Sequence, residues 1–211
     1  MKKFFFNIPI QQPGQLTSGV YDAVDNRRLA MEEPTRFPIL TAVNGFVEAG
    51  EAFRVIAIAG ESASEKHNLA LFRTELGELC KRRGIQCPNG VETVSAAPDQ
   101  RVVSHVSTFE ALISLVEDDD ELFACVTYGT KPQSMALLTA IRYAYRLKKN
   151  TSISCIVYGN VDRERRDGVM VETGRQVYDE TAMAQLDEIT RMLAERGVQE
   201  PEIAIKRILS L

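Results

Sequence analysis

A short polar turn between two apolar stretches carries the residues of this chain best suited to bind an anion. Residues 128–134 read Tyr-Gly-Thr-Lys-Pro-Gln-Ser and combine hydroxyl and amide groups with the positive charge of Lys131. Gly129 permits a tight turn, and Pro132 fits the first turn of a helix, where its missing N–H is not needed. Because the free N–H groups of a helix start point into the same space, the sequence predicts an anion-binding turn. The candidate ligand contacts are Tyr128, Gly129, Thr130, Lys131, Gln133 and Ser134.

The alternative interpretation is a turn that only caps the helix and leaves Lys131 in solvent. The flanking patterns fit both interpretations. Residues 122–126 form an unbroken apolar run typical of a strand buried on both faces, and after the turn apolar residues recur at helical spacing to about Lys149. The turn is therefore expected to join a central strand to a helix.

The same two patterns alternate along most of the chain. Apolar runs predict strands at residues 3–10, 54–59, 92–96, 122–126 and 152–158. Helical spacing predicts helices at 37–49, from Ser62 or Ser64 to 83, from a cap at Ser107 to 116, and from 130 to about 149. Strands that alternate with helices predict an α/β fold with a mainly parallel, doubly wound sheet.

Polar residues follow three of the predicted strands. In an open parallel sheet the ligand crevice lies beyond the carboxyl ends of the strands, so these residues are expected near the glycine turn. They are Gln11 and Gln12 after the first strand, Glu61 and Ser62 after the second, and Asn160 after the strand that ends at Gly159. The alternative is that they are solvated loop residues.

The character of the chain changes after residue 160. A charged turn at 162–168 precedes an expected hairpin around Gly174, a long amphipathic helix at 179–196 and a short helix at 200–211. About fifty residues are marginal for a separate core. We therefore expect one ligand-binding domain at 1–160, with 161–211 as a small hairpin and helical appendage packed on it.

Two charged features of this appendage have unremarkable interpretations. The Arg163, Arg165 and Arg166 cluster alternates with acidic residues and predicts a solvated turn. Glu172 with Arg175 is too sparse a pattern to indicate a restriction-type nuclease core. Neither feature is counted as part of the predicted site.

Composition excludes several classes of function. The chain is 45% apolar and 26% charged with a net charge of −4, which is ordinary for a soluble protein and does not favour binding to long duplex nucleic acid. The four cysteines lack metal-ligand spacing and indicate buried thiols in a reducing compartment, so no metal site is expected. The apolar start of the chain is too short for a signal peptide or a membrane span, which predicts a cytoplasmic protein without membrane contact.

The order strand, Gly-Thr-Lys-Pro-x-Ser, helix resembles the signature turn of CARF domains, the sensors of type III CRISPR defence. The resemblance extends over about residues 1–160 and implies a Rossmann-like homodimer that binds a cyclic oligoadenylate across its two-fold axis. The family usually has a second glycine where this chain has Tyr128. A tyrosine at that position could stack on adenine.

The resemblance implies two functions, and a third remains from the fold class. The leading hypothesis is a CRISPR-associated sensor of cyclic tetra-adenylate that needs no cofactor. The second is a ring nuclease that cleaves this ligand without metal, with Lys131 and Ser134 stabilising the transition state; no strong general base is visible. The third is a Rossmann-type enzyme with a nucleotide cofactor, although neither a Gly-x-Gly-x-x-Gly fingerprint nor a Walker motif is present.

Overall fold

A seven-stranded sheet forms the centre of the molecule, with the strand order β2-β7-β6-β5-β1-β3-β4. The computed structural model describes residues 1–166 and 168–209. Strands β1, β3, β4, β5 and β6 are parallel, whereas β7 runs antiparallel to β6. The strands are β1 Lys2–Asn7, β2 Asp22–Ala23, β3 Phe53–Ala59, β4 Val91–Ser95, β5 Glu121–Cys125, β6 Ser152–Arg166 and β7 Val169–Asp179. The predicted α/β class with a mainly parallel, Rossmann-like sheet is confirmed.

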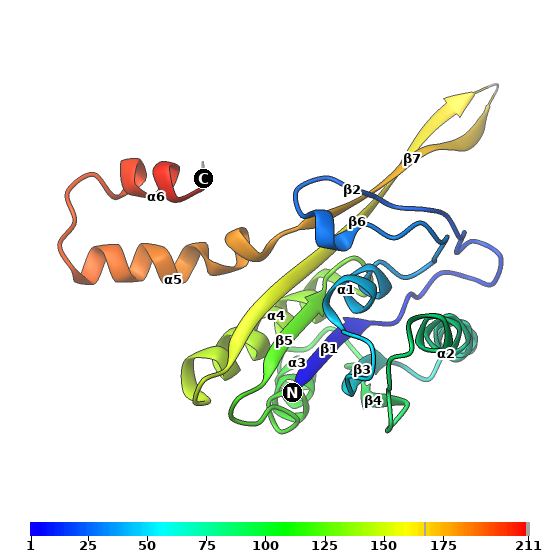
Figure 1. Ribbon diagram of the computed structural model, residues 1–211, viewed down its shortest axis with the longest axis horizontal. Helices are drawn as coiled ribbons and strands as arrows, with labels where there is room; N and C mark the ends of the chain where they lie inside the picture. Colours follow the sequence, from blue (N-terminus) through cyan, green and yellow to red (C-terminus); the bar gives the residue numbers. More distant parts are fainter. Residues whose placement is uncertain (167, 210–211) are drawn as a thin grey trace.

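Helices cover both faces of this sheet (Figure 1). The helical elements of the described chain are the 3-10 turn η1 Arg27–Leu29 and the helices α1 Ile39–Phe46, α2 Ala63–Arg83, α3 Val102–Ile113, α4 Lys131–Leu147, α5 Thr181–Glu195 and α6 Pro201–Leu209. Phe4 and Phe6 join the core cluster that includes residues of α1 and α2, whereas Phe5 joins the cluster that includes residues of α3 and α4. Because successive strand residues point to opposite faces, the apolar run of β1 fills two cores at once.

A buried ion pair lies where the parallel strands β1 and β5 begin. Lys3 is completely buried, and its Nζ lies 2.6 Å from Asp120 Oδ2 and 3.0 Å from Glu117 Oε2. Asp120 is also buried, at 2% exposed, whereas the Glu117 side chain is 75% exposed. A buried lysine requires such partners, which gives the acidic run before β5 a structural role.

Two element boundaries were predicted wrongly. Helix α3 begins at Val102 rather than at Ser107, because the Asp99 carboxylate accepts hydrogen bonds from the Arg101 N–H and the Ser104 hydroxyl just before and within its first turn. Ser107 lies inside the helix, where its hydroxyl donates to the Val103 carbonyl. The N-cap of α3 is Arg101, six residues before the expected cap at Ser107, and it makes no side-chain cap hydrogen bond.

Strand β6 does not end at residue 158, and this also corrects the predicted hairpin. It continues to Arg166 and pairs with β7 from Val157 onward, so the chain reverses next to Gly168 rather than at Gly174. Gly174 lies within β7 opposite Asp162, where the pairing register shifts. The β6–β7 hairpin therefore extends the sheet beyond its carboxyl edge (Figure 1).

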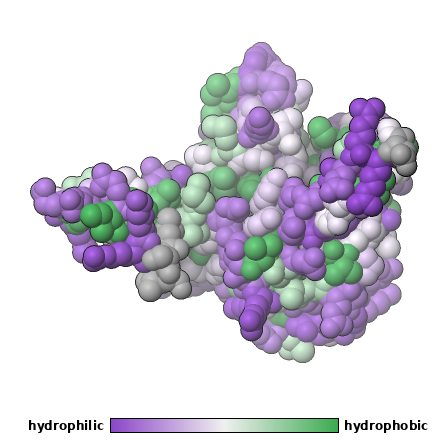
Figure 2. Space-filling view, turned by 90° about the horizontal axis from the view of Figure 1, so that it is seen from above, coloured by the Kyte–Doolittle hydropathy of each residue, from purple (hydrophilic) through white to green (hydrophobic). Residues whose placement is uncertain are grey.

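Helices α5 and α6 extend away from the sheet as an arm (Figures 1 and 2). The structure describes every residue of α5, and none of them is buried. Ion pairs connect the arm to α4, with Arg142 contacting Asp187 and Arg146 Nη2 lying 2.7 Å from Glu188 Oε2. Among the described residues, no helix is both long enough and apolar enough to cross a membrane.

Candidate functional site

The glycine turn lies where ligands bind in sheets of this topology. The chain passes from β1 to β3 and β4 on one side, and then to β5 and β6 on the other. The order of strands therefore reverses between β1 and β5, and the crevice at such a switch point is the usual ligand site. The turn directly follows β5, so the predicted residues are correctly placed at this edge.

The turn is held by hydrogen bonds among its own residues. Gly129 has a φ of +89°, and Thr130 is the N-cap of α4. The Gln133 N–H donates to Thr130 Oγ1 at 3.4 Å, and the Thr130 N–H donates to Gln133 Oε1 at 2.7 Å. This capping box uses the side chains of Thr130 and Gln133 within the turn, as the helix-capping alternative predicted.

Lys131 is the side chain of the turn best placed to meet an anion. It is exposed at the first residue of α4, where the helix dipole also favours negative charge. Ser134 is partly buried, and its hydroxyl donates to the Tyr128 carbonyl at 3.5 Å. The turn thus presents one cation, with its hydroxyl groups already partnered.

Tyr128 faces the protein interior. Its hydroxyl donates to the Arg36 carbonyl at 2.8 Å, and its ring packs against the core cluster that contains Tyr21. Burial raises the pKa of Tyr128 well above its usual range, with the neighbouring Tyr21 adding to the effect. In this arrangement the hydroxyl anchors the ring beside the turn, while the side chain also lines the cleft.

Asn7, at the carboxyl end of β1, was not singled out by the sequence reasoning. Its side chain is 2% exposed, and neither amide atom has a hydrogen-bond partner within the described part of the chain. It lies under Gly129, where an added Cβ would come within 2.8 Å of the Asn7 Cβ. An unpaired buried amide costs about 1–3 kcal/mol, so this group indicates a binding role at the switch point. The signal in the sequence that could have identified Asn7 is an asparagine at the end of an aromatic strand.

A cleft of about 780 Å³ lies beside the turn. Its floor is formed just after β5 and within β6, where the Gly159 N–H donates to Thr127 Oγ1 at 2.8 Å. Tyr128 and the loop after β1 also line it, and the β6–β7 hairpin forms one wall. The lining residues include Gln11, Thr17, Tyr128, Gly159, Arg163 and Glu172.

The hairpin wall carries a charged network around Glu172. The Glu172 carboxylate accepts hydrogen bonds from the Thr17 hydroxyl, from Arg175 at 2.6 Å and from Arg163 at 3.4 Å. Burial raises the pKa of Glu172, but the hydrogen bonds from Thr17 and Arg175 outweigh it and hold the pKa below its usual value. Arg175 is itself buried, and its guanidinium lies 5.5 Å from the centre of the Tyr21 ring.

Arg163 was expected in a solvated turn, and Glu172 with Arg175 was expected to be too sparse a pattern to indicate a nuclease core. The structure places Arg163 and Glu172 in the lining of the cleft, with Arg175 hydrogen-bonded to Glu172, because β6 continues past Asn160 and pairs with β7. Their spacing in the sequence gives no sign of this arrangement. Only the antiparallel pairing of the two strands brings them together.

The two glutamines after β1 lie in different environments. Gln11 lines the cleft, and its amide oxygen is buried with no partner among the described residues. Gln12 accepts a hydrogen bond from the Ser64 hydroxyl at 3.2 Å. Asn68, fully buried, donates to the carbonyls of Pro9 and Gln11 and thereby fixes this loop. Gln11 is therefore the better placed of the two to reach a ligand.

The other predicted residues are engaged in local structure. Ser62 caps α2 by accepting a hydrogen bond from the Glu65 N–H at 3.2 Å, and Glu61 forms an exposed ion pair with Lys66 at 2.8 Å. Asn160 lies within β6 and donates to Asp162 at 2.7 Å. Of the predicted residues, only Gln11 and Tyr128 line the cleft; those outside its lining are Gln12, Glu61, Ser62, Gly129, Thr130, Lys131, Gln133, Ser134 and Asn160.

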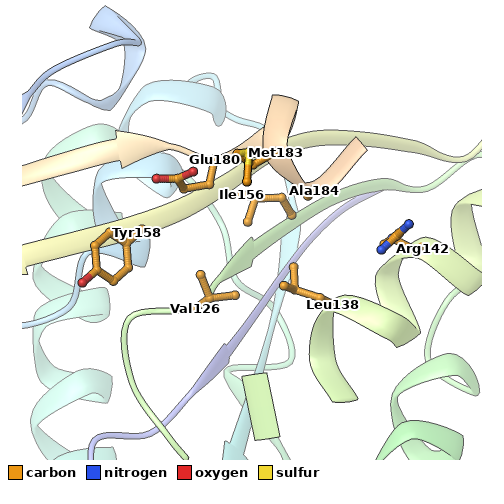
Figure 3. Close-up of a pocket in the computed structure, with 8 residues that line it drawn as sticks. All are labelled: Val126, Leu138, Arg142, Ile156, Tyr158, Glu180, Met183 and Ala184. Carbon is orange, nitrogen blue, oxygen red and sulfur yellow. The ribbon is translucent and has the colours of Figure 1, made fainter. Parts of the chain in front are cut away.

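A second hollow of about 470 Å³ lies between β6, α4 and the start of α5. Figure 3 shows Tyr158 and Glu180 toward one side of it and Arg142 toward the other. Its other lining residues are aliphatic or methionine, and Arg142 is already paired with Asp187. None of the predicted residues lines this hollow, so we regard the cleft beside the turn as the candidate site.

No known family model matches the chain, and no curated protein is significantly similar to it. Among the described residues, no group of three or more histidine, cysteine, aspartate or glutamate side chains is arranged to hold a metal ion.

Proposed function

We propose that this protein is a CARF-type sensor that binds a cyclic oligoadenylate, with cyclic tetra-adenylate favoured. The observation that carries the proposal is the position of the Gly129-Thr130-Lys131 turn at the switch point of the sheet, next to a cleft. Lys131 is exposed at the start of α4 and Arg163 lines the cleft, so the two cations lie on different elements, the turn and the hairpin. A chain of phosphates requires this kind of distributed positive charge.

The proposal includes a symmetric homodimer, in which two copies of the turn share one ring. An apolar groove between α3 and α4 supports it, because the groove begins at Pro132, within the turn. Val102 and Met135 along this groove are 79% and 68% exposed. Exposed apolar surface next to a ligand site fits a second copy of the chain, which would also bring the two turns together.

Titration calorimetry with cyclic tetra-adenylate tests the proposal. We expect one ring bound per two chains, and we expect Lys131→Ala to weaken binding by at least about tenfold because it removes a phosphate contact. Lys149→Ala is the matched control, since this exposed lysine lies just beyond the opposite end of α4. Equal affinity of the Lys131 variant and the wild type would remove this residue from the site.

Analysis of the bound ligand separates the alternatives. Intact ring after incubation without metal supports the sensor, and a linear product supports the ring nuclease. Absence of binding by wild-type protein would contradict both. A thermal shift with NAD, FAD or S-adenosylmethionine would then support a Rossmann-type enzyme.

A further inference from the structure

We propose that the β6–β7 hairpin recognises ribose, and that Glu172 and Arg163 together select a 2′-hydroxyl next to a 3′-phosphate. This inference rests on the proposed function, because it assigns a ribonucleotide to the same cleft. Arg163 on β6 and Glu172 on β7 both line the cleft and lie outside the glycine turn. The ligand class is a nucleotide with an intact 2′-hydroxyl.

Glu172 is positioned as a hydrogen-bond acceptor. Thr17 and Arg163 donate to its Oε1, and Arg175 donates to its Oε2. An ionised carboxylate has about four acceptor positions, so about one remains for a ligand. The side chain is 31% exposed and lines the cleft, so a ligand donor can reach it.

Buried contacts fix the orientation of this carboxylate. Arg175 is 7% exposed, and a Cβ on Gly19 would come within 2.4 Å of the Arg175 Nε, so the guanidinium is closely packed. A rigid acceptor loses little conformational entropy when it binds a hydroxyl. Arg175 thus acts through Glu172 as a positioning residue.

Arg163 supplies the second half of the recognition. Its side chain is 48% exposed, and its bond to Glu172 is long, at 3.4 Å. It can therefore turn toward a phosphate at little cost while its guanidinium stays within reach of the carboxylate. An acceptor and a cation side by side match the 2′-hydroxyl and the neighbouring 3′-phosphate of a ribonucleotide.

The same network makes Glu172 unsuited to act as a general base. Its hydrogen bonds from Thr17 and Arg175 stabilise the ionised form and so reduce its tendency to accept a proton. We therefore assign it to recognition of the hydroxyl, with no bond-making step.

The test compares the affinities of cyclic tetra-adenylate and its all-2′-deoxy analogue. We expect wild-type protein to prefer the ribose form by at least tenfold, because the deoxy ligand leaves the carboxylate without its partner. This comparison needs no variant and so does not depend on the folding of any substitution. Equal affinities would overturn the inference.

Two substitutions separate the two roles. Glu172→Gln is expected to reduce the preference to less than threefold, while Arg163→Gln is expected to weaken both ligands by a similar factor. Arg166→Gln is the matched control, because this arginine lies at the end of β6, is 64% exposed and pairs with Glu164. An unchanged ribose preference in a folded Glu172→Gln variant would also overturn the inference.

A smaller probe distinguishes this failure from failure of the proposed function. If neither cyclic ligand binds, the proposed function is wrong, and adenosine 3′-monophosphate is compared with its 2′-deoxy form by chemical-shift titration. A ribose preference that Glu172→Gln removes would support the hairpin site on its own. Equal binding of the two nucleotides, or no binding of either, would overturn it.

Discussion

At the residue scale, Gly129 combines a left-handed backbone with a contact that leaves no room for a side chain. Its φ is +89°, and a Cβ would lie 2.8 Å from both the Cβ and the Cγ of Asn7. Gly50 has a similar φ of +80° but nothing within 4 Å of an added Cβ. A comparison of substitutions at the two positions therefore separates the effect of backbone strain from that of steric contact.

We expect Gly50→Ala to lower the free energy of unfolding by about 1–2 kcal/mol, the cost of the left-handed conformation alone. Gly129→Ala should cost more, because Asn7 or the turn must also move. It should also weaken binding of cyclic tetra-adenylate. Urea denaturation and calorimetry measure both effects, and equal losses of stability in the two variants would show that the contact with Asn7 is unimportant.

A second prediction concerns the buried pair of Lys3 and Asp120. Asp120→Ala should lower the free energy of unfolding by about 3 kcal/mol, because it leaves a buried ammonium with only the exposed Glu117 as a carboxylate partner. Glu117→Ala should cost less than about 1 kcal/mol, because its carboxylate is largely in solvent. Urea denaturation of the two variants at neutral pH measures the difference, and equal losses would contradict the assignment.

The pH dependence of this pair has a definite sign. Burial raises the pKa of Asp120, but the hydrogen bond from Lys3 and the Glu117 N–H outweigh it and lower the pKa. A lowered pKa in the folded state stabilises the protein above the unfolded value of about 4, and this stability is lost as pH falls through the folded value. The stability difference between wild type and Asp120→Ala should therefore narrow below about pH 4.

Residues of the site differed in how far they could be predicted. Gly129 and Lys131 were predicted because a strand, a turn and a helix follow one another directly in the sequence. Asn7, Arg163 and Glu172 depend on which strands become neighbours, and this is decided by packing of the whole sheet. The spacing of these residues along the sequence does not indicate which strands will pair.

At the scale of elements, the parallel strands β1, β3, β5 and the first half of β6 were predicted because each is a short, largely buried apolar run, whereas in β4 only Val94 is buried. The full length of β6 was not predicted, because its second half is highly charged. Val161 and the residues after it pair with β7 on an exposed ribbon, where side chains meet water and the backbone hydrogen bonds define the strand. Charge indicated a turn in the sequence where the structure has a strand.

The ends of helices also differed in how well they were predicted. Helix α2 was predicted to end at residue 83, and it does so, followed by Gly84 in the left-handed conformation with a φ of 63°. The start of α3 was predicted too late because Ser107 was taken as its cap, whereas Asp99, outside the helix, accepts hydrogen bonds from the Arg101 N–H and the Ser104 hydroxyl.

At the scale of the whole molecule, the groove between α3 and α4 determines the expected oligomer. Met135→Glu places a charge on this apolar surface and should convert the proposed dimer to a monomer, with weaker binding of the cyclic ligand. Leu147→Glu is the matched control at the other end of α4, where the native side chain is 63% exposed. Sedimentation velocity measures the mass, and a dimer that survives Met135→Glu would place the interface elsewhere.

The β6–β7 ribbon links the cleft to the arm formed by α5 and α6. Gly159 on β6 contributes to the floor of the cleft, and Asp179, the last residue of β7, accepts hydrogen bonds from Thr181 at the start of α5 and from Asn26. Gly159 pairs with Val177, so the contact with the start of the arm lies only two residues along β7 from the cleft. Under the proposed function, a ligand that displaced this part of the ribbon would therefore also move the start of α5.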